Sequence, residues 1–228
     1  MKPIVIILLA IFGAWSIMHL VFCFIENEKL RKITKPICLL LLGIAAAVAA
    51  PKYPLIYIGA FLGAIGDVLL INKSKLTFFL AGTAVFICGH GCYFAQIMMH
   101  LSTYGGFVFP WWAYLIVFGT LLVLTFALYP FDKKLAGIAT LAGNFYMPFL
   151  VVLIASGVFL AIKMNQAGNN PLAGILISIG YLMFITSDAT LIYTTFVKDI
   201  KRRDFPIMIT YLLGEFGIVF GLLSVIIL

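Results

Sequence analysis

The sequence predicts an all-α polytopic membrane protein that forms a bundle of eight transmembrane helices. Of its 228 residues, 64% are hydrophobic and 10% are charged, whereas a soluble domain is about half apolar and one quarter charged. Apolar segments close to the length that an α-helix needs to cross a bilayer, about 20 residues, recur along the chain. Backbone groups in lipid must be hydrogen-bonded internally, which favours helices, and the alternation typical of barrel strands is not seen.

Eight apolar segments follow one another in a single domain, residues 1–228. They are residues 3–25, 34–50, 54–71, 76–99, 107–128, 135–162, 171–197 and 205–228. The first is too long for the apolar core of a signal peptide and lacks a small-residue cleavage site, so we expect it to remain as a span. The second is short and follows the charged run ENEKLRK. The third lies between the turn sequences PKYP and NKSK, and the fourth follows NKSK directly.

The last four segments are bounded in the same way. The fifth ends at YPFDKK, and the long sixth ends before NQAGNNP, which is rich in turn-forming residues. The seventh ends at the charged run KDIKRRD, which the eighth follows. No gap between segments is long enough for a soluble domain. Any chemistry is therefore expected within the bundle or at its edge.

The positive charges predict the orientation of the bundle. Twelve of the fifteen Lys and Arg residues lie in or beside the first, third, fifth and seventh gaps, and the other three lie on the opposite side. The twelve are Lys29, Arg31, Lys32, Lys35, Lys73, Lys75, Lys133, Lys134, Lys198, Lys201, Arg202 and Arg203, and the three are Lys2, Lys52 and Lys163. The positive-inside rule places the twelve in the cytoplasm and both termini outside. The net charge of +7 is thus interpreted as an orientation signal and not as a nucleic-acid-binding surface.

Three acidic residues lie within predicted spans, namely Asp67, Asp188 and Glu215. An ionisable side chain at this depth is a candidate functional residue. From the rise of about 1.5 Å per helical residue, Asp67 lies about 7 Å from the cytoplasmic edge, and the other two acids lie about 15 Å from it. His90 lies deeper, at about 20 Å. The acids therefore gather in the cytoplasmic half of the bundle.

Helical spacing predicts which way these side chains face. Gly59, Gly63 and Asp67 share one face, and small residues allow another helix to approach closely, so we expect Asp67 to face the bundle interior. Other polar residues join the candidate set by their position in a span; these are His90 and Tyr93 in the fourth, Asn144 and Tyr146 in the sixth, Asp188 in the seventh, and Tyr211 and Glu215 in the eighth.

Structural interpretations of the same residues remain open at this stage. Glu215 would then be bonded to Tyr or Ser neighbours, His90 and Tyr93 would form an interhelical hydrogen-bonded pair, and the two aspartates would be polar anchors. The four cysteines, Cys23, Cys38, Cys88 and Cys92, lie in apolar runs and are expected to be small buried hydrophobic residues. Cys88 and Cys92 lack a third ligand at the usual spacing, so no metal or other cofactor is predicted.

Several short motifs occur in a characteristic order. They are Lys35-Pro36, Gly66-Asp67, the set Phe86, Gly89, His90 and Tyr93, then Ser187-Asp188, and Tyr211 with Gly214. In this order and span placement, the sequence resembles the YhhN family of integral membrane proteins, whose characterised members include lysoplasmalogenases. The resemblance covers most of the chain.

The resemblance implies an eight-helix bundle in a bacterial inner membrane that hydrolyses the vinyl ether bond of lysoplasmalogens to a fatty aldehyde and a glycerophospho-base. The two proposed catalytic aspartates of the family correspond to Asp67 and Asp188. Glu215 stands where relatives often carry another polar residue, such as His or Gln, so the resemblance does not imply a family-wide catalytic role for it.

Two neighbouring carboxyl groups suit this chemistry, because protonation of a vinyl ether requires an acid and the resulting oxocarbenium ion requires a nearby anion. Mutual repulsion in a dry site favours a pair that shares one proton. The other candidates for positioning water or substrate are His90, Tyr93, Asn144, Tyr146, Ser187, Tyr211, Glu215 and Lys35. The lipid phosphate is expected at the cytoplasmic rim near Lys35, Arg202 or Arg203. The alternatives are a small proton-coupled transporter and a lipid-binding protein without turnover.

Overall fold

The computed structural model describes residues 2–72, 75–106, 119, 138–196 and 198–227, and it is helical throughout these ranges apart from short turns. The helices are α1 (Pro3–Phe24), α2 (Glu28–Ala49), α3 (Pro54–Leu69), α4 (Leu76–Thr103), α6 (Ile138–Gln166), α7 (Leu172–Phe196) and α8 (Asp204–Ile227), and a 3₁₀ turn, η1 (Leu70–Asn72), follows α3. All seven α-helices are long and apolar enough to cross a membrane. The predicted span at 107–128 lies outside the described residues, so the total of eight stays a prediction.

Three helix boundaries differ from the prediction by four residues or more: the start of α2, the end of α4, and the end of α6, which lies at Gln166 rather than at residue 162. The second helix begins at Glu28 rather than at residue 34, because the Asn27 side chain caps it by accepting a 3.1 Å hydrogen bond from the backbone N–H of Leu30. The fourth continues to Thr103 rather than ending at residue 99. In all three cases the helix includes a polar turn, which a criterion based on apolar length leaves out.

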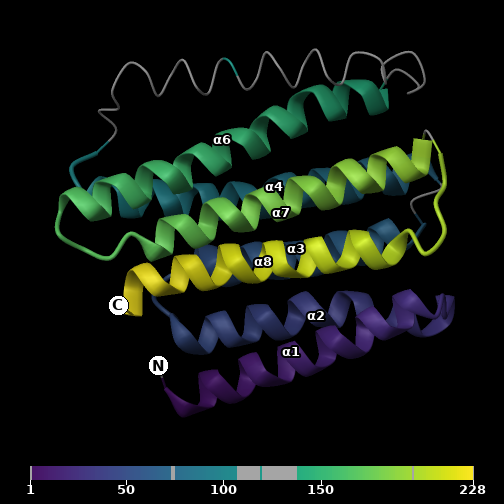
Figure 1. Ribbon diagram of the computed structural model, residues 1–228, viewed down its shortest axis with the longest axis horizontal. Helices are drawn as coiled ribbons and strands as arrows, with labels where there is room; N and C mark the ends of the chain where they lie inside the picture. Colours follow the sequence, from purple (N-terminus) through teal and green to yellow (C-terminus); the bar gives the residue numbers. More distant parts are fainter. Residues whose placement is uncertain (1, 73–74, 107–118, 120–137, 197, 228) are drawn as a thin grey trace.

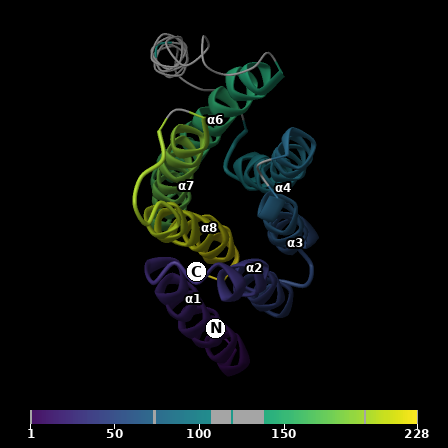
Figure 2. The ribbon, with the colours of Figure 1, turned by 90° about the vertical axis from the view of Figure 1, so that its right-hand side faces the viewer.

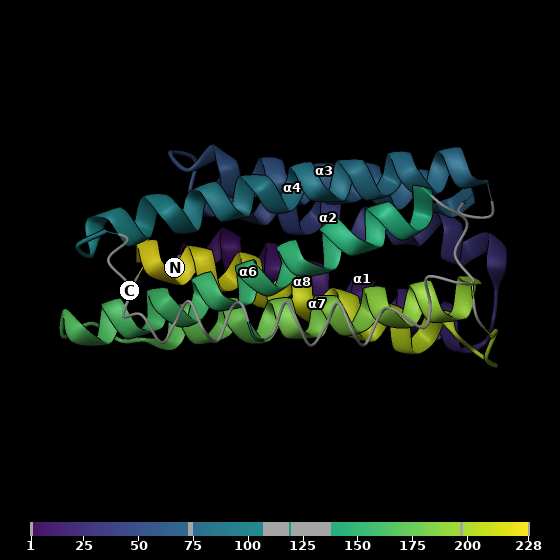
Figure 3. The same ribbon diagram turned by 90° about the horizontal axis from the view of Figure 1, so that it is seen from above.

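The helices run side by side along one axis, with the two chain termini at the same end (Figures 1 and 3). The opposite end holds the α1–α2, α3–α4 and α7–α8 turns and is called the basic end here, because Lys29, Lys75 and Lys201 lie in or beside those turns. Seen along this axis, α7 and α8 lie on one side and α3 and α4 on the other (Figure 2). The α1–α2 pair lies beside α8 and α3, and α6 lies beside α7 and α4.

Aromatic side chains fill the space between the α3–α4 pair and the α7–α8 pair. The His90 and Phe184 ring centroids are 4.3 Å apart. The Phe86 ring is 6.1 Å from both the Phe184 and the Tyr211 rings. We call Phe86, Phe184 and Tyr211 the aromatic wall, since these three rings cross the interior at one level of the bundle.

The prediction that all four cysteines are buried is wrong for Cys88. Cys23 and Cys38 are buried, but Cys88 is exposed on α4 and Cys92 is half-buried. An apolar run does not distinguish a residue facing the core from one facing lipid, because both environments are apolar.

Glycines allow close packing of α7 against α8, and replacement of Gly180 is expected to disrupt it. A Cβ atom at Gly180 would lie 2.7 Å from the backbone nitrogen of Ile218 and 2.8 Å from the carbonyl oxygen of Gly214. Gly180→Ala should therefore destabilise the protein by about 1–3 kcal/mol, measured by thermal unfolding in detergent. Gly91→Ala is the matched control, because a Cβ there meets nothing within 4 Å; an equal loss in both variants would contradict this packing argument.

Candidate active site

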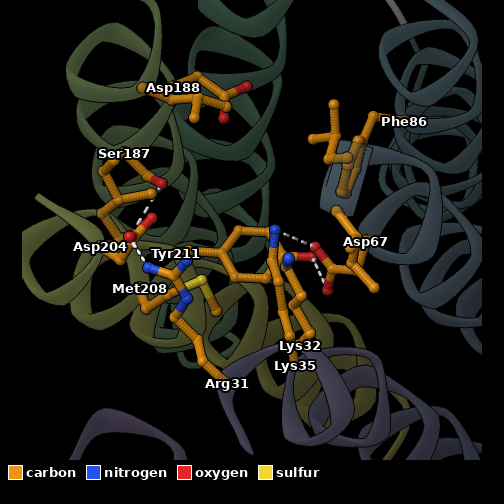
Figure 4. Close-up of a pocket in the computed structure, with 14 residues that line it drawn as sticks. Arg31, Lys32, Lys35, Asp67, Phe86, Ser187, Asp188, Asp204, Met208 and Tyr211 are labelled. Carbon is orange, nitrogen blue, oxygen red and sulfur yellow. Dashed lines mark hydrogen bonds and ion pairs between the residues drawn. The ribbon is translucent and has the colours of Figure 1, made fainter. Parts of the chain in front are cut away.

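A pocket opens at the basic end between α2, α3, α4, α7 and α8 (Figure 4). Its volume is about 670 Å³ when the open mouth is included. The charged side chains that line it are Arg31, Lys32, Lys35, Asp67, Asp188 and Asp204. Three cations and three acids thus meet in one small space, where the charges interact more strongly than they would in water.

Asp67 lies on α3, and neither of its carboxylate oxygens faces lipid. Its Oδ1 is 3.0 Å from the Lys35 Nζ, and its Oδ2 accepts a 2.9 Å hydrogen bond from the Tyr211 hydroxyl. The residue is 0% exposed, which confirms the prediction that it faces the interior. Helix α3 is followed by η1, so Asp67 lies one turn before the end of the helical segment at the basic end. A cation and a hydroxyl therefore hold this carboxylate from α2 and α8.

Asp188 lies on α7, on the opposite wall of the same pocket from Asp67 (Figure 4). Tyr146 of α6 forms a side-chain hydrogen bond with it. Asp188 is half-buried and has no ion pair with a residue that the structure describes. The two aspartates thus share a pocket but differ in their partners.

The mouth of the pocket is formed by the first turns of α2 and α8. Arg31 forms an ion pair with Asp204 across these two helices. Lys32 lies 2.5 Å from Glu28 one turn earlier in α2, and both of these side chains are largely exposed. Arg31 is thus tied to α8, whereas Lys32 has only an exposed partner of its own helix within the described residues.

Ser187, the neighbour of Asp188, links α7 to α8. Its hydroxyl donates a 2.9 Å hydrogen bond to the backbone carbonyl of Ile207. Ser187 also lines the pocket. Its bond to the backbone fixes the part of α7 that presents Asp188.

A second group of buried polar side chains lies farther from the basic end. The Tyr93 hydroxyl donates a 3.1 Å hydrogen bond to Glu215 Oε2, and His90 Nε2 is 3.9 Å from Glu215 Oε1. None of these three side chains lines the pocket. His90 also packs against the ring of Phe184 in the aromatic wall.

The structure brings together part of the predicted site. Lys35, Asp67, Ser187, Asp188 and Tyr211 line the pocket, and Tyr146 reaches it through its bond to Asp188. His90, Tyr93 and Glu215 instead form the deeper group. Asn144 belongs to α6, but its side chain lies outside the described part of the structure.

The predicted rim arginines do not line the pocket. The Arg202 guanidinium lies over the Phe24 ring, 4.1 Å from its centroid, and Arg203 pairs with Asp199 one turn away. Arg31, Lys32 and Asp204 take the rim positions instead. Arg31 lies four residues before Lys35, and this spacing puts the two basic side chains on one face of α2. Lys35 is a predicted rim residue, whereas Arg31 and Lys32 enter the sequence prediction only as part of the orientation signal.

Within the described residues, no group of three or more His, Cys, Asp and Glu side chains is arranged to hold a metal ion. His19 is accounted for by its neighbours, since its Nδ1 lies 2.7 Å from Thr34 Oγ1 and its Nε2 lies 3.4 Å from Cys23 Sγ.

The fold and the pocket define an α-helical polytopic membrane protein with two aspartates, Asp67 and Asp188, on opposite walls of a pocket at one end of its bundle. The chain belongs to the YhhN family, whose family model matches residues 30–222, most of its length. Comparison with curated proteins and with solved structures gives no match.

Proposed function

We propose that this protein hydrolyses the vinyl ether bond of lysoplasmalogens and releases a fatty aldehyde and a glycerophospho-base. The observation that carries the proposal is that Asp67 and Asp188 stand on opposite walls of one pocket with unlike partners. Membership of the YhhN family supports a lysoplasmalogenase-like activity.

The unlike partners assign different roles to the two acids. The Lys35 ammonium and the Tyr211 hydroxyl face the two oxygens of Asp67, and such donors favour an ionised carboxylate. Asp188 has the Tyr146 hydroxyl as a partner and no ion pair among described residues. Asp188 is therefore the proton donor, and Asp67 is the anion that stabilises the cationic intermediate.

The reaction begins when Asp188 transfers its proton to the vinyl carbon farther from the ether oxygen. The adjacent carbon and the ether oxygen then share the positive charge of an oxocarbenium ion, opposite the Asp67 carboxylate. Water adds to that carbon and returns a proton to Asp188, which forms a hemiacetal. Transfer of the hemiacetal hydroxyl proton to the ether oxygen accompanies cleavage of the carbon–oxygen bond. The products are the aldehyde and the glycerol hydroxyl, and both aspartates are restored.

The rim favours a substrate with a phosphate near the membrane surface. Arg31, which is paired with Asp204, and Lys32 offer positive charge to the phosphate at the mouth, while Asp67 and Asp188 lie farther from the first turns of α2 and α8. The apolar residues Leu70, Phe86 and Leu191 line the same pocket and suit a hydrocarbon chain. The vinyl ether, which joins the glycerol to the chain, would lie beside Asp67 and Asp188.

Replacement of Lys32 tests the phosphate contact. Lys32→Gln should raise KM for a vinyl-ether lysolipid by up to about tenfold, which corresponds to about 1.4 kcal/mol of binding, with little change in kcat. Lys29→Gln is the matched control, since Lys29 is in the same helical turn but does not line the pocket. An equal KM for Lys32→Gln and wild type would refute this contact.

A proton-coupled transporter is the alternative from the sequence, because it too uses buried acids. Alternating access would require the acids to communicate with both sides of the membrane. The pocket that contains the aspartates opens at the basic end, which favours the hydrolase.

The deciding experiment uses purified protein in detergent with a panel of lysolipids that carry a vinyl ether, an alkyl ether or an ester at the same position. Aldehyde release from the vinyl ether alone is expected. Release of fatty acid from the ester, or no aldehyde from any vinyl ether, would overturn the proposal.

A further inference from the structure

The deeper group of buried polar side chains, Glu215, His90 and Tyr93, has no part in the chemistry above, and neither does Tyr181, whose ring lies beside that of His90. Glu215 is 1% exposed, and it comes from α8 one turn beyond Tyr211. Tyr93 satisfies one carboxylate oxygen, but Oε1 is 3.9 Å from His90 Nε2, which is too far for a direct hydrogen bond.

Three buried polar atoms around this carboxylate lack partners within the described residues. They are the two ring nitrogens of His90 and the hydroxyl oxygen of Tyr181. The His90 and Tyr181 rings are neighbours, with centroids 5.6 Å apart, and Glu215 interacts electrostatically with Tyr181. Because buried polar groups are nearly always hydrogen-bonded, such a set points to a bound polar molecule.

Glycines of α3 pack closely against this group of buried side chains. A Cβ atom at Gly63 would lie 2.5 Å from Leu39 Cδ1 and 4.0 Å from Glu215 Oε1, and one at Gly59 would lie 2.4 Å from the Tyr93 ring. Glycine at both positions thus lets α3 approach the buried side chains. On the side toward the pocket, the His90 ring packs on the aromatic wall.

We propose that Glu215, His90 and Tyr181 bind a water molecule behind the aromatic wall and hold it in reserve for hydrolysis. A buried water needs two to four polar partners, and a polar separation beyond 3.5 Å is one that water can bridge. The water donates one hydrogen bond to the Glu215 carboxylate. It also accepts a hydrogen bond from the Tyr181 hydroxyl or donates one to a ring nitrogen of His90. Three different helices, α8, α4 and α7, supply these partners.

The reserve role rests on the proposed hydrolysis. A lysolipid that fills the pocket covers its mouth, so the water that captures the oxocarbenium ion must already be inside. The aromatic wall consists of side chains, and rotation of the Phe86 or Tyr211 ring opens a route from this site to the pocket. On capture, the water oxygen bonds to the cationic carbon, and one of its protons passes to the Asp188 carboxylate.

Radiolytic footprinting of the substrate-free wild-type protein tests the binding site. Hydroxyl radicals generated from a bound water oxidise the side chains that touch it, so Tyr181 should be oxidised despite being 0% exposed. After correction for intrinsic reactivity, we expect a rate at least fivefold above that of Phe12, a buried aromatic residue of α1. The rate at Tyr181 should fall in His90→Phe. Equal corrected rates for Tyr181 and Phe12 would overturn the water site.

Tyr181→Phe, with Tyr57→Phe as the matched control, tests the consequence for stability and turnover. Loss of a water-bonded hydroxyl should lower Tm, whereas removal of an unpartnered hydroxyl would raise it and overturn the water site. We expect kcat to fall at least tenfold with KM within twofold of wild type. An unchanged kcat would overturn the reserve role. If wild type hydrolyses no vinyl ether, the proposed function fails, while footprinting and Tm still decide the water site.

Discussion

Asp188→Asn is expected to reduce aldehyde release by about 10²–10⁴-fold, the contribution of a well-placed general acid. Asparagine preserves the shape of the side chain and can still bond to Tyr146, but it has no proton to transfer to carbon. The loss should appear in kcat, because the proposed contacts with the phosphate and the chain are made by other residues of the pocket. The measurement is the initial rate of aldehyde formation by purified protein, together with its unfolding temperature.

The matched control is Asp199→Asn, which makes the same chemical change at an exposed residue paired with Arg203. This variant should retain the wild-type rate. An Asp188→Asn protein that is folded and fully active would eliminate Asp188 as the acid. If the wild-type rate persisted there but disappeared in Asp67→Asn, the two roles would have to be exchanged.

Most of the helical architecture follows from apolar length, and the deviations have a local cause. The predicted start of the span at residue 54 agrees with the start of α3 at Pro54. The start of α2 could not be found in this way, because its first two turns are charged and its boundary is set by the Asn27 cap. The length of an apolar run gives the number of residues that can lie in lipid. The length of a helix is instead set by how far its backbone hydrogen bonds continue, including through polar turns.

The candidate site is less predictable than the helices. The face that Asp67 shares with glycines predicts that it faces the interior, and its burial confirms this. Helical spacing does not predict the separation of Glu215 and His90 from the pocket. Glu215 is one turn from Tyr211, which lines the pocket, yet Glu215 itself does not line it, and His90 packs behind the rings of Phe86 and Phe184. Such a barrier depends on side chains from distant segments, which helical spacing within one segment does not reveal.

The positive charges illustrate the same limit. Arg31 and Arg202 both contribute to the predicted orientation signal, but Arg31 lines the pocket while Arg202 covers a phenylalanine ring. The difference arises from the pairing of α2 with α8 across the basic end. A count of positive charges predicts which side of the membrane a loop faces, but not which residue each charged side chain contacts.

Lys35→Met should destabilise the protein by about 3 kcal/mol, because it leaves the buried Asp67 carboxylate without its cation. Methionine retains much of the apolar stem of lysine, so the loss reports the charge rather than the packing. The Lys35 side chain is 20% exposed and that of Asp67 is 1% exposed, so solvent replaces little of the lost interaction. The measurement is the free energy of unfolding in mixed detergent micelles.

The double variant Lys35→Met with Asp67→Asn separates the pair's contribution to stability from its contribution to catalysis. Removal of both charges leaves no unpaired ion in the interior, so the double variant should recover most of the stability that Lys35→Met loses. Its aldehyde release should remain at background, because the anion opposite the oxocarbenium ion is absent. Additive losses of stability in the double variant would mean that Lys35 and Asp67 are not coupled. Recovery of activity together with stability would mean that Asp67 has no catalytic role and that its charge serves only to balance that of Lys35.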